Sequence, residues 1–177
     1  MDKLHDRSLQ PQDMQTVCTF AQTAEELFYI APYAQFPWQP DAFSNNLNEY
    51  ERLSNTVFLI GDDIVGFANF YNAEIGISGF IGNMVVNPHY RRQGWGKQII
   101  LHMLAKGFHE HRFNTIYISC FSPNTPALLL YKSLGFTPYG IEQRTDYKNK
   151  PIALFNFSLT AKQFNSLQAN QISSSTR

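Results

Sequence analysis

The sequence is poor in cysteine, since its 177 residues include only Cys18 and Cys120, which lie far apart and form no CxxC pair. This spacing argues against a disulfide framework or a cysteine-rich zinc site, and it fits reduced thiols in the cytoplasm. The histidine-rich triplet at His109–His111 lacks the spacing of a zinc-binding helix motif. We therefore expect no bound metal.

The chain also lacks net charge and long apolar segments. Fourteen basic side chains balance fourteen acidic ones, which leaves no overall field to attract nucleic acid or an anionic membrane. No segment reaches the roughly 18–20 apolar residues that a membrane span needs. The first thirty residues contain no uninterrupted apolar stretch typical of a secretion signal. We expect a cytoplasmic protein that binds neither nucleic acid nor membrane.

A chain of 177 residues that is 44% hydrophobic can bury one sizeable core. We expect one domain over residues 1–160, with a helical region at 1–56 and a strand-rich core at 57–159. Residues 161–177 are polar, and we expect a flexible tail there. Charged residues make up 16% of the chain, which is low enough to be compatible with an apolar groove or with a homodimer interface.

Helical spacing of apolar residues predicts helices within residues 11–22 and 40–53, with a proline-rich loop or short helical turns between them. Gly61-Asp62-Asp63 separates two β-rich segments and predicts a hairpin. Further strands are expected at 78–86, 114–121 and 152–159. Helices are expected after Gly94 and after Thr125, a natural N-cap that precedes Pro126. This alternation predicts an α/β domain with a mixed sheet.

The segment "VVNPHYRRQGWGKQII", residues 85–100, combines glycine and positive charge at the start of a predicted helix. The first turn of a helix has free amide donors and a positive dipole end, and glycines there let a bulky anion approach. A P-loop does not fit, because Arg91 and Gln98 replace its first glycine and its Ser or Thr. A dinucleotide fingerprint fails at Ile99. A helix start with exposed arginines and no ligand is the alternative.

A second motif favours an anion-binding site over a helix start without a ligand. Residues Arg91 to Gly96 follow Val86-Asn87-Pro88 and fit the pattern R/Q-x-x-G-x-G/A, and about thirty residues later Asn124 precedes a helix with Tyr131 that ends in Gly135-Phe136. Over roughly residues 57–159, the chain resembles the GCN5-related N-acetyltransferases, the GNAT family. The resemblance implies a single α/β domain whose mixed, mostly antiparallel sheet is flanked by helices and has splayed strands at an acetyl-CoA cleft.

The resemblance also implies acetyl-CoA as the cosubstrate and direct transfer of its acetyl group to a primary amine of a small molecule, peptide or protein. It assigns contacts with acetyl-CoA to Met84, Val85, Val86, Arg91, Arg92, Gln93, Gly94, Trp95, Gly96, Lys97, Asn124, Ala127 and Tyr131. Two of these would be catalytic: the Val86 amide would bind the developing oxyanion, and Tyr131 would give a proton to the leaving thiolate. Asn124 as a simple helix cap and Tyr131 as a packed helix aromatic are the alternatives.

One feature of many GNAT enzymes is missing. The strand segment "FIGNMVV" has no glutamate to accept the amine proton, and Asn83 cannot act as a base. Water molecules, or a carboxylate from Glu74, Glu142 or Asp146, would have to serve. The missing glutamate leaves a second interpretation open, in which the domain binds an acyl-CoA as a sensor or interaction module with little turnover.

The acceptor is the least determined part of the hypothesis. By resemblance, its site would lie among the N-terminal helices and the last strands, with contacts from Phe28, Tyr29, Phe36, Trp38, Glu74 and Tyr139. Such aromatic residues could bind a cationic amine or an apolar group, and they could equally be core or dimer contacts. The sequence does not choose among a polyamine, an aminoglycoside, an amino acid and a protein N-terminus, or between acetyl and longer acyl donors.

Overall fold

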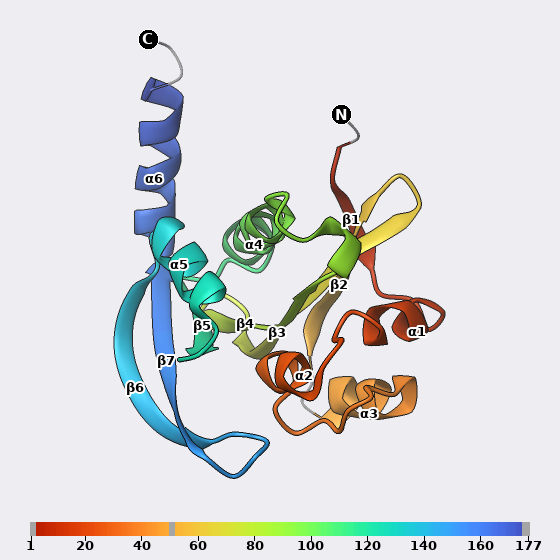
Figure 1. The fold of residues 1–177 in the computed structure, drawn as a ribbon. Helices are drawn as coiled ribbons and strands as arrows, with labels where there is room; N and C mark the ends of the chain where they lie inside the picture. The colour runs from red at the N-terminus through yellow and green to blue at the C-terminus, as the bar shows by residue number, and fades with distance from the viewer. Residues whose placement is uncertain (1–2, 50–51, 175–177) are drawn as a thin grey trace.

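The computed structural model describes residues 3–49 and 52–174. Within them, seven strands form one sheet in the order β1-β2-β3-β4-β5-β7-β6, in which β4 and β5 are parallel and the other neighbours antiparallel (Figure 1). The strands are β1 (His5–Ser8), β2 (Leu53–Ile60), β3 (Asp63–Glu74), β4 (Ser78–Val86), β5 (Thr115–Phe121), β6 (Thr137–Thr145) and β7 (Pro151–Thr160). The predicted fold class is confirmed.

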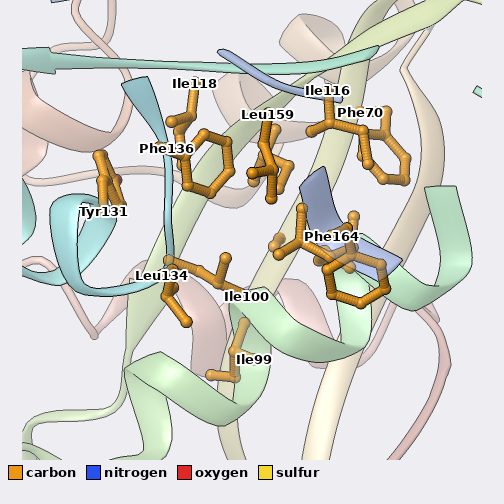
Figure 2. Close-up of a cluster of buried hydrophobic side chains, with 14 of the residues drawn as sticks. Phe70, Ile99, Ile100, Ile116, Ile118, Tyr131, Leu134, Phe136, Leu159 and Phe164 are labelled. Atoms are coloured by element: carbon orange, nitrogen blue, oxygen red, sulfur yellow. The ribbon is translucent and has the colours of Figure 1, made fainter. Parts of the chain in front are cut away.

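Helices cover both faces of this sheet (Figure 1). They are α1 (Asp13–Cys18), α2 (Ala24–Ile30), α3 (Pro40–Glu49), the 3-10 turn η1 (Pro88–Tyr90), α4 (Trp95–Ala105), its π-helical continuation η2 (Lys106–Glu110), α5 (Thr125–Ser133) and α6 (Ala161–Ser174). Helices α1, α2 and α3 pack around Phe43 and Phe67 on one face. Helices α4, α5 and α6 bury Ile99, Leu134 and Phe164 against the other face (Figure 2).

The strongest turn signals in the sequence lie where expected. Ile60 pairs with Asp63 across the β2–β3 hairpin, and Gly61 adopts the left-handed conformation (φ +57°) that favours glycine. Gly135, with φ +88°, follows the end of α5. The N-cap of α5 is Asn124 rather than the predicted Thr125, since the Asn124 side chain accepts a hydrogen bond from the Ala127 amide at 3.4 Å.

The structure contains elements that the sequence patterns did not predict. The first is β1, a short edge strand of largely exposed polar residues, and α2 occupies part of the segment between the two predicted N-terminal helices. The strand β6 is exposed along most of its length, so it has no clear alternation of buried and exposed residues. These elements depend on pairing and packing with distant parts of the chain.

The expected flexible tail is instead a helix over residues 161–174, and residues 175–177 lie outside the described part. Phe164 of α6 is buried beside Phe108, with ring centroids 5.1 Å apart. Leu167 lies against Gly135, where the space for a β-carbon is already taken by its side chain. Two apolar residues therefore attach a polar segment to the core. No helix in residues 3–49 and 52–174 has the length and apolar character needed to cross a membrane.

Candidate active site

Strands β4 and β5 pair along only part of their length. Their register runs from Ser78 opposite Thr115 to Ile81 opposite Ile118. Beyond Ile81, β4 continues along β3 alone, and beyond Ile118, β5 continues along β7 alone. The resulting β4–β5 gap is bounded by residues 82–86 of β4 and 119–121 of β5. The splayed pair of strands implied by the resemblance is thus present.

A β-bulge lies where β4 leaves β5. The register of β3 and β4 shifts between the pairs Phe67–Val85 and Asn69–Gly82, and Asn83 has a φ of +47°. The buried Asn83 side chain accepts a hydrogen bond from Asn69 at 3.1 Å and donates one to the carbonyl of Ile30 at 2.9 Å. Asn83, which was excluded as a base, therefore fixes the bulge and connects it to the end of α2.

The loop after β4 opens the start of α4. Gly94 is the N-cap of α4 with a φ of +87°, and no heavy atom lies within 4 Å of the position that a β-carbon would take. At Gly96, the nearest atom to that position is Cε of Met84, at 3.4 Å. Arg92 and Lys97 are exposed beside these glycines. Helix-start amides with open access and nearby cations are suited to a pyrophosphate group.

Arg91 has a different environment from its neighbours. Its guanidinium binds the Glu26 carboxylate with hydrogen bonds of 2.8 and 3.1 Å, and it also donates to the carbonyls of Phe20 and Val86 at 2.6 and 3.2 Å. Burial alone would raise the pKa of Glu26, but hydrogen bonds from Arg91 and the Gln22 amide hold it below its usual value. The Arg91 side chain thus joins the loop to the N-terminal helices, and a direct contact with acetyl-CoA stays a prediction.

The other predicted loop residues differ in exposure. Gln93 is exposed and donates to the carbonyl of His89 at 3.0 Å. Trp95 is half-buried at the start of α4, and its indole nitrogen is buried with no hydrogen-bond partner in the described residues. Ala127 lies in the first turn of α5 and packs against the core.

Tyr131 lies on α5, with its ring 6.0 Å from that of Phe136 and 6.1 Å from that of Phe157, and its side chain is buried (Figure 2). Burial raises the pKa of Tyr131 well above its usual value, and the nearby Cys120 and Tyr71 raise it further. Cys120 lies on β5 at the gap, and Tyr71 lies on β3 on the wall of the cavity described next. Like an ordinary tyrosine, Tyr131 is protonated at neutral pH, and its interaction with Cys120 and Tyr71 places it near the gap.

A cavity of about 700 Å³ adjoins the gap. It touches β4 at Ile81, Gly82 and Asn83 and β5 at Ser119 and Phe121, so it reaches the point where the two strands separate. Six aromatic side chains from α2, the loop after it and the sheet contribute to its wall: Phe28, Tyr29, Tyr33, Tyr71, Phe80 and Phe121. This position and lining suit the acceptor of a transfer reaction.

The far wall of the cavity comes from β5 and the β6–β7 hairpin, and a series of polar contacts runs along it. The Ser119 hydroxyl donates to Oδ1 of Asn156 at 2.7 Å, and Nδ2 of Asn156 donates to Oε1 of Glu142 at 2.5 Å. The other carboxylate oxygen of Glu142 lies 2.5 Å from a guanidinium nitrogen of Arg144. All four side chains line the cavity.

The structure brings together only part of the predicted acceptor set. Phe28 and Tyr29 line the cavity. Four residues do not: Phe36 is exposed in the loop after α2, Trp38 is buried against Phe43, Glu74 ends β3, and Tyr139 lies on β6 with its ring against Tyr117. Of the three carboxylates considered as bases, Glu142 alone is among the residues lining the cavity, whereas Asp146 accepts the Lys148 and Lys150 amides in the β6–β7 turn.

Sequence reasoning missed Tyr71, Ser119, Arg144 and Asn156. Asn156 left one signal in the sequence, because it is an amide side chain within the largely apolar strand "IALFNFSL", and the structure buries it with 7% of its surface exposed. A buried amide must find hydrogen-bond partners, and its partners here identify the polar wall. Across residues 3–49 and 52–174, no three His, Cys, Asp or Glu side chains gather as a metal site would require.

Comparisons with known proteins agree with this geometry. The model of the acetyltransferase (GNAT) family matches residues 20–136. Ribosomal protein bS18-alanine N-acetyltransferase of Escherichia coli K12 is 28% identical over 101 residues, which cover 57% of this chain and 65% of that relative. The SPbeta prophage-derived uncharacterized N-acetyltransferase YokL of Bacillus subtilis is 26% identical over 141 residues, covering 76% of each chain. The chain thus spans a little under two thirds of the first of these relatives.

Solved structures show the same fold. Spermidine N-acetyltransferase from Vibrio cholerae, in complex with CoA and spermine, superposes with a TM-score of 0.78 at 15% identity, over 93% of this chain and 99% of that one. The ribosomal-protein-S18-alanine N-acetyltransferase from Escherichia coli superposes with a TM-score of 0.67 at 22% identity, over 89% and 94%. At these identities the likeness concerns the fold.

Proposed function

This chain belongs to the acetyltransferase (GNAT) family, and from that premise we propose that it transfers an acetyl group from acetyl-CoA directly to a primary amine. One observation carries the proposal: the gap between β4 and β5 lies between an open, glycine-lined helix start and a cavity with an aromatic and polar lining. A carrier bound along the gap would have its anionic part at the start of α4 and its reactive end near the cavity.

The residues present suit acetyl-CoA. Residues Met84, Val85 and Val86 lie in the part of β4 that pairs with β3 but has no β5 partner, so backbone groups on its free side can bond the pantetheine arm, whose amides need such partners. The amides from Arg92 to Lys97 would bind the pyrophosphate, with Gly94 leaving room for it. When bound, acetyl-CoA supplies an acetyl group activated as a thioester.

Two residues of the chain would then act on the thioester, one at its carbonyl oxygen and one at its sulfur. By the resemblance, the amide of Val86 would donate a hydrogen bond to the carbonyl oxygen of the acetyl group, where negative charge develops; Val86 is the last residue of β4 and lies outside the cavity lining. Tyr131 would hold a proton on its hydroxyl and give it to the departing sulfur. The phenol is protonated at neutral pH, as proton donation requires, while burial raises its pKa and makes it a weaker acid than a free tyrosine.

Relatives suggest what the acceptor could be. The names of two similar proteins specify an alanine of ribosomal protein bS18 and spermidine. For this chain we propose only the shared chemistry, a primary amine on a small molecule or a peptide. The homodimer and the cytoplasmic location stay predictions from the sequence.

The test is release of free CoA thiol from acetyl-CoA in the presence of an amine, with the amide product identified by mass spectrometry. The panel would include spermidine, an alanine-initiated peptide, free amino acids and arylalkylamines. We expect amine-dependent thiol release with at least one member.

A sensor or interaction module is the second candidate, and the lack of a carboxylate on β4 beside the gap favours it. That candidate predicts binding of acetyl-CoA without amine-dependent thiol release. Such a result across the whole panel would overturn the enzyme proposal.

A further inference from the structure

The cavity beside the gap has one wall that suits a positive charge. Residues two apart on a strand share a face, and β6 presents Glu142 and Arg144 to the cavity, as β7 presents Leu154 and Asn156. Because Glu142 is paired with Leu154 across the two strands, these four side chains form one continuous surface. Glu142 contributes the carboxylate of this surface.

The Glu142 carboxylate is held in position from both sides. Its Oε1 accepts from Asn156 at 2.5 Å, and its Oε2 lies 2.5 Å from Arg144. A carboxylate has about four acceptor positions, so these two contacts fix its orientation and leave acceptor capacity on both oxygens. Asn156 is itself fixed, because its amide oxygen accepts from Ser119 at 2.7 Å. The hydrogen-bonded series Ser119–Asn156–Glu142 thus begins at the gap and ends at a carboxylate.

Aromatic rings line much of the rest of the cavity, together with Arg52, whose guanidinium lies 4.8 Å from the centre of the Tyr71 ring. Phe28 packs on Phe121 with ring centroids 4.4 Å apart, and Tyr71 packs on Phe80 at 5.2 Å. Glu142 lies close enough to Tyr71 to raise its pKa, although burial is the largest cause and Arg52 and Ser119 act in the opposite direction. Ring faces and a carboxylate in one cavity favour a cation that carries apolar surface.

Primary amines carry a proton at neutral pH, since their pKa lies near that of lysine, about 10.4. Resting on the proposed function, we propose that Glu142 binds the ammonium group of the acceptor and that the cavity selects a cationic primary amine attached to an apolar body. Asn156 and Ser119 are positioning residues, which hold the carboxylate at the cavity wall near the gap. The Phe28–Phe121 and Tyr71–Phe80 pairs provide the apolar contacts.

The experiment is a calorimetric titration of the full chain, in the presence of CoA, with 2-phenylethylamine and with its uncharged analogue 2-phenylethanol. We expect Glu142→Gln to weaken binding of the amine at least about tenfold, as loss of a charged hydrogen-bond partner does, and to leave binding of the alcohol unchanged. Glu74→Gln is the matched control, because it removes a carboxylate outside the cavity lining and should change neither.

Arg144→Gln separates ligand binding from a structural role of the Glu142–Arg144 ion pair. If Glu142 binds the ammonium group, this variant keeps or tightens amine binding, because the carboxylate loses a competing cation. Equal weakening by Arg144→Gln and Glu142→Gln would overturn the proposal. So would amine binding that is unchanged in Glu142→Gln, or absent in the wild type.

The thiol-release assay distinguishes this failure from failure of the proposed function. If wild-type protein acetylates amines but Glu142→Gln binds 2-phenylethylamine normally, only the inference about Glu142 is wrong. If Glu142 governs amine binding but no amine releases thiol, the transferase proposal fails and the amine site stands.

Discussion

Arg91 and Glu26 lie 65 residues apart in the sequence and are joined by two hydrogen bonds of 2.8 and 3.1 Å. The pair connects the loop at the start of α4 with α2, whose residues Phe28 and Tyr29 line the cavity. Arg91 also binds the carbonyls of Phe20 and Val86, the latter at the end of β4. One guanidinium therefore sets the position of the proposed cofactor loop relative to the proposed acceptor wall.

Arg91→Ala should destabilise the fold by about 1–3 kcal/mol, because it leaves a carboxylate and two carbonyls without a strong donor. It should also raise both the Kd for acetyl-CoA and the KM for the amine, since the loop and α2 lose their common anchor. Urea unfolding and steady-state kinetics measure these effects. Arg92→Gln is the control: it removes an exposed charge from the same loop and should cost less than about 0.5 kcal/mol. Equal stability losses in the two variants would refute the anchoring role.

Tyr131→Phe should lower kcat by about 10²–10⁴-fold, the usual contribution of a general acid. Affinity for acetyl-CoA should change little, because the ring and its packing remain. Tyr117→Phe removes a phenol hydroxyl from a side chain that does not line the cavity and serves as the control. Wild-type turnover of Tyr131→Phe at every pH would remove the acid role.

Alkaline pH should weaken the fold before tyrosines titrate. Burial raises the pKa of Cys18 to about 11 and that of Cys120 to about 12, whereas an unfolded thiol has a pKa near 8.5. A raised folded-state pKa gives a stability contribution that is complete below about pH 8.5 and is lost as pH rises towards 11 and 12, at up to about 1.4 kcal/mol per pH unit for each thiol. Urea midpoints measured between pH 8 and 10 should fall more steeply for wild type than for a Cys18→Ala, Cys120→Ala variant. If the urea midpoints of both proteins fell equally with pH, the buried thiols would not be the cause of the alkaline loss of stability.

The C-terminal helix should contribute strongly to stability. Phe164→Ala removes a ring that is 3% exposed in the core, and such truncations cost about 3–5 kcal/mol. Leu129→Ala, at a side chain that is 63% exposed on α5, should cost less than about 0.5 kcal/mol. Thermal or urea unfolding gives both values. A small loss for Phe164→Ala would show that α6 is not needed to complete the core.

Much of the central fold could be predicted because its signals are local. Gly61-Asp62-Asp63 forms its hairpin with a left-handed glycine, and Pro126 and Gly135 mark the ends of α5. The strands β2 to β5 and β7 are rich in β-branched and aromatic residues. The family motifs added the splay of β4 from β5, which no local pattern specifies.

The elements missed by the sequence depend on distant partners. The polar residues of α6 gave no helical core face, yet Phe164 and Leu167 dock it on Phe108 and Gly135. Edge strands such as β6 have exposed residues on both faces, so alternation of burial is weak there. Tertiary packing rather than intrinsic propensity decides such segments.

The acceptor site could not be predicted for a related reason. Its wall draws on α2, α3 and five strands, and its polar series joins Ser119, Asn156 and Glu142 from three of those strands. The resemblance and the aromatic content of the N-terminal region selected Phe28 and Tyr29 together with Trp38, which is buried in the core instead. Only the three-dimensional arrangement separates ligand-facing rings from packed ones.

The central claim is that the loop at Gly94 binds acetyl-CoA, and calorimetric titration of acetyl-CoA into Gly94→Glu tests it most directly. Gly76→Glu is a matched control, because Gly76 also has positive φ (+81°) and open space around its β-carbon position, but lies in the β3–β4 turn. Both variants place a glutamate at a similar positive φ with open space around the β-carbon position, so they add the same charge under comparable backbone conditions. We predict that wild type and Gly76→Glu bind acetyl-CoA with similar affinity and that Gly94→Glu binds at least about tenfold more weakly. Unchanged affinity in a folded Gly94→Glu variant would contradict the account.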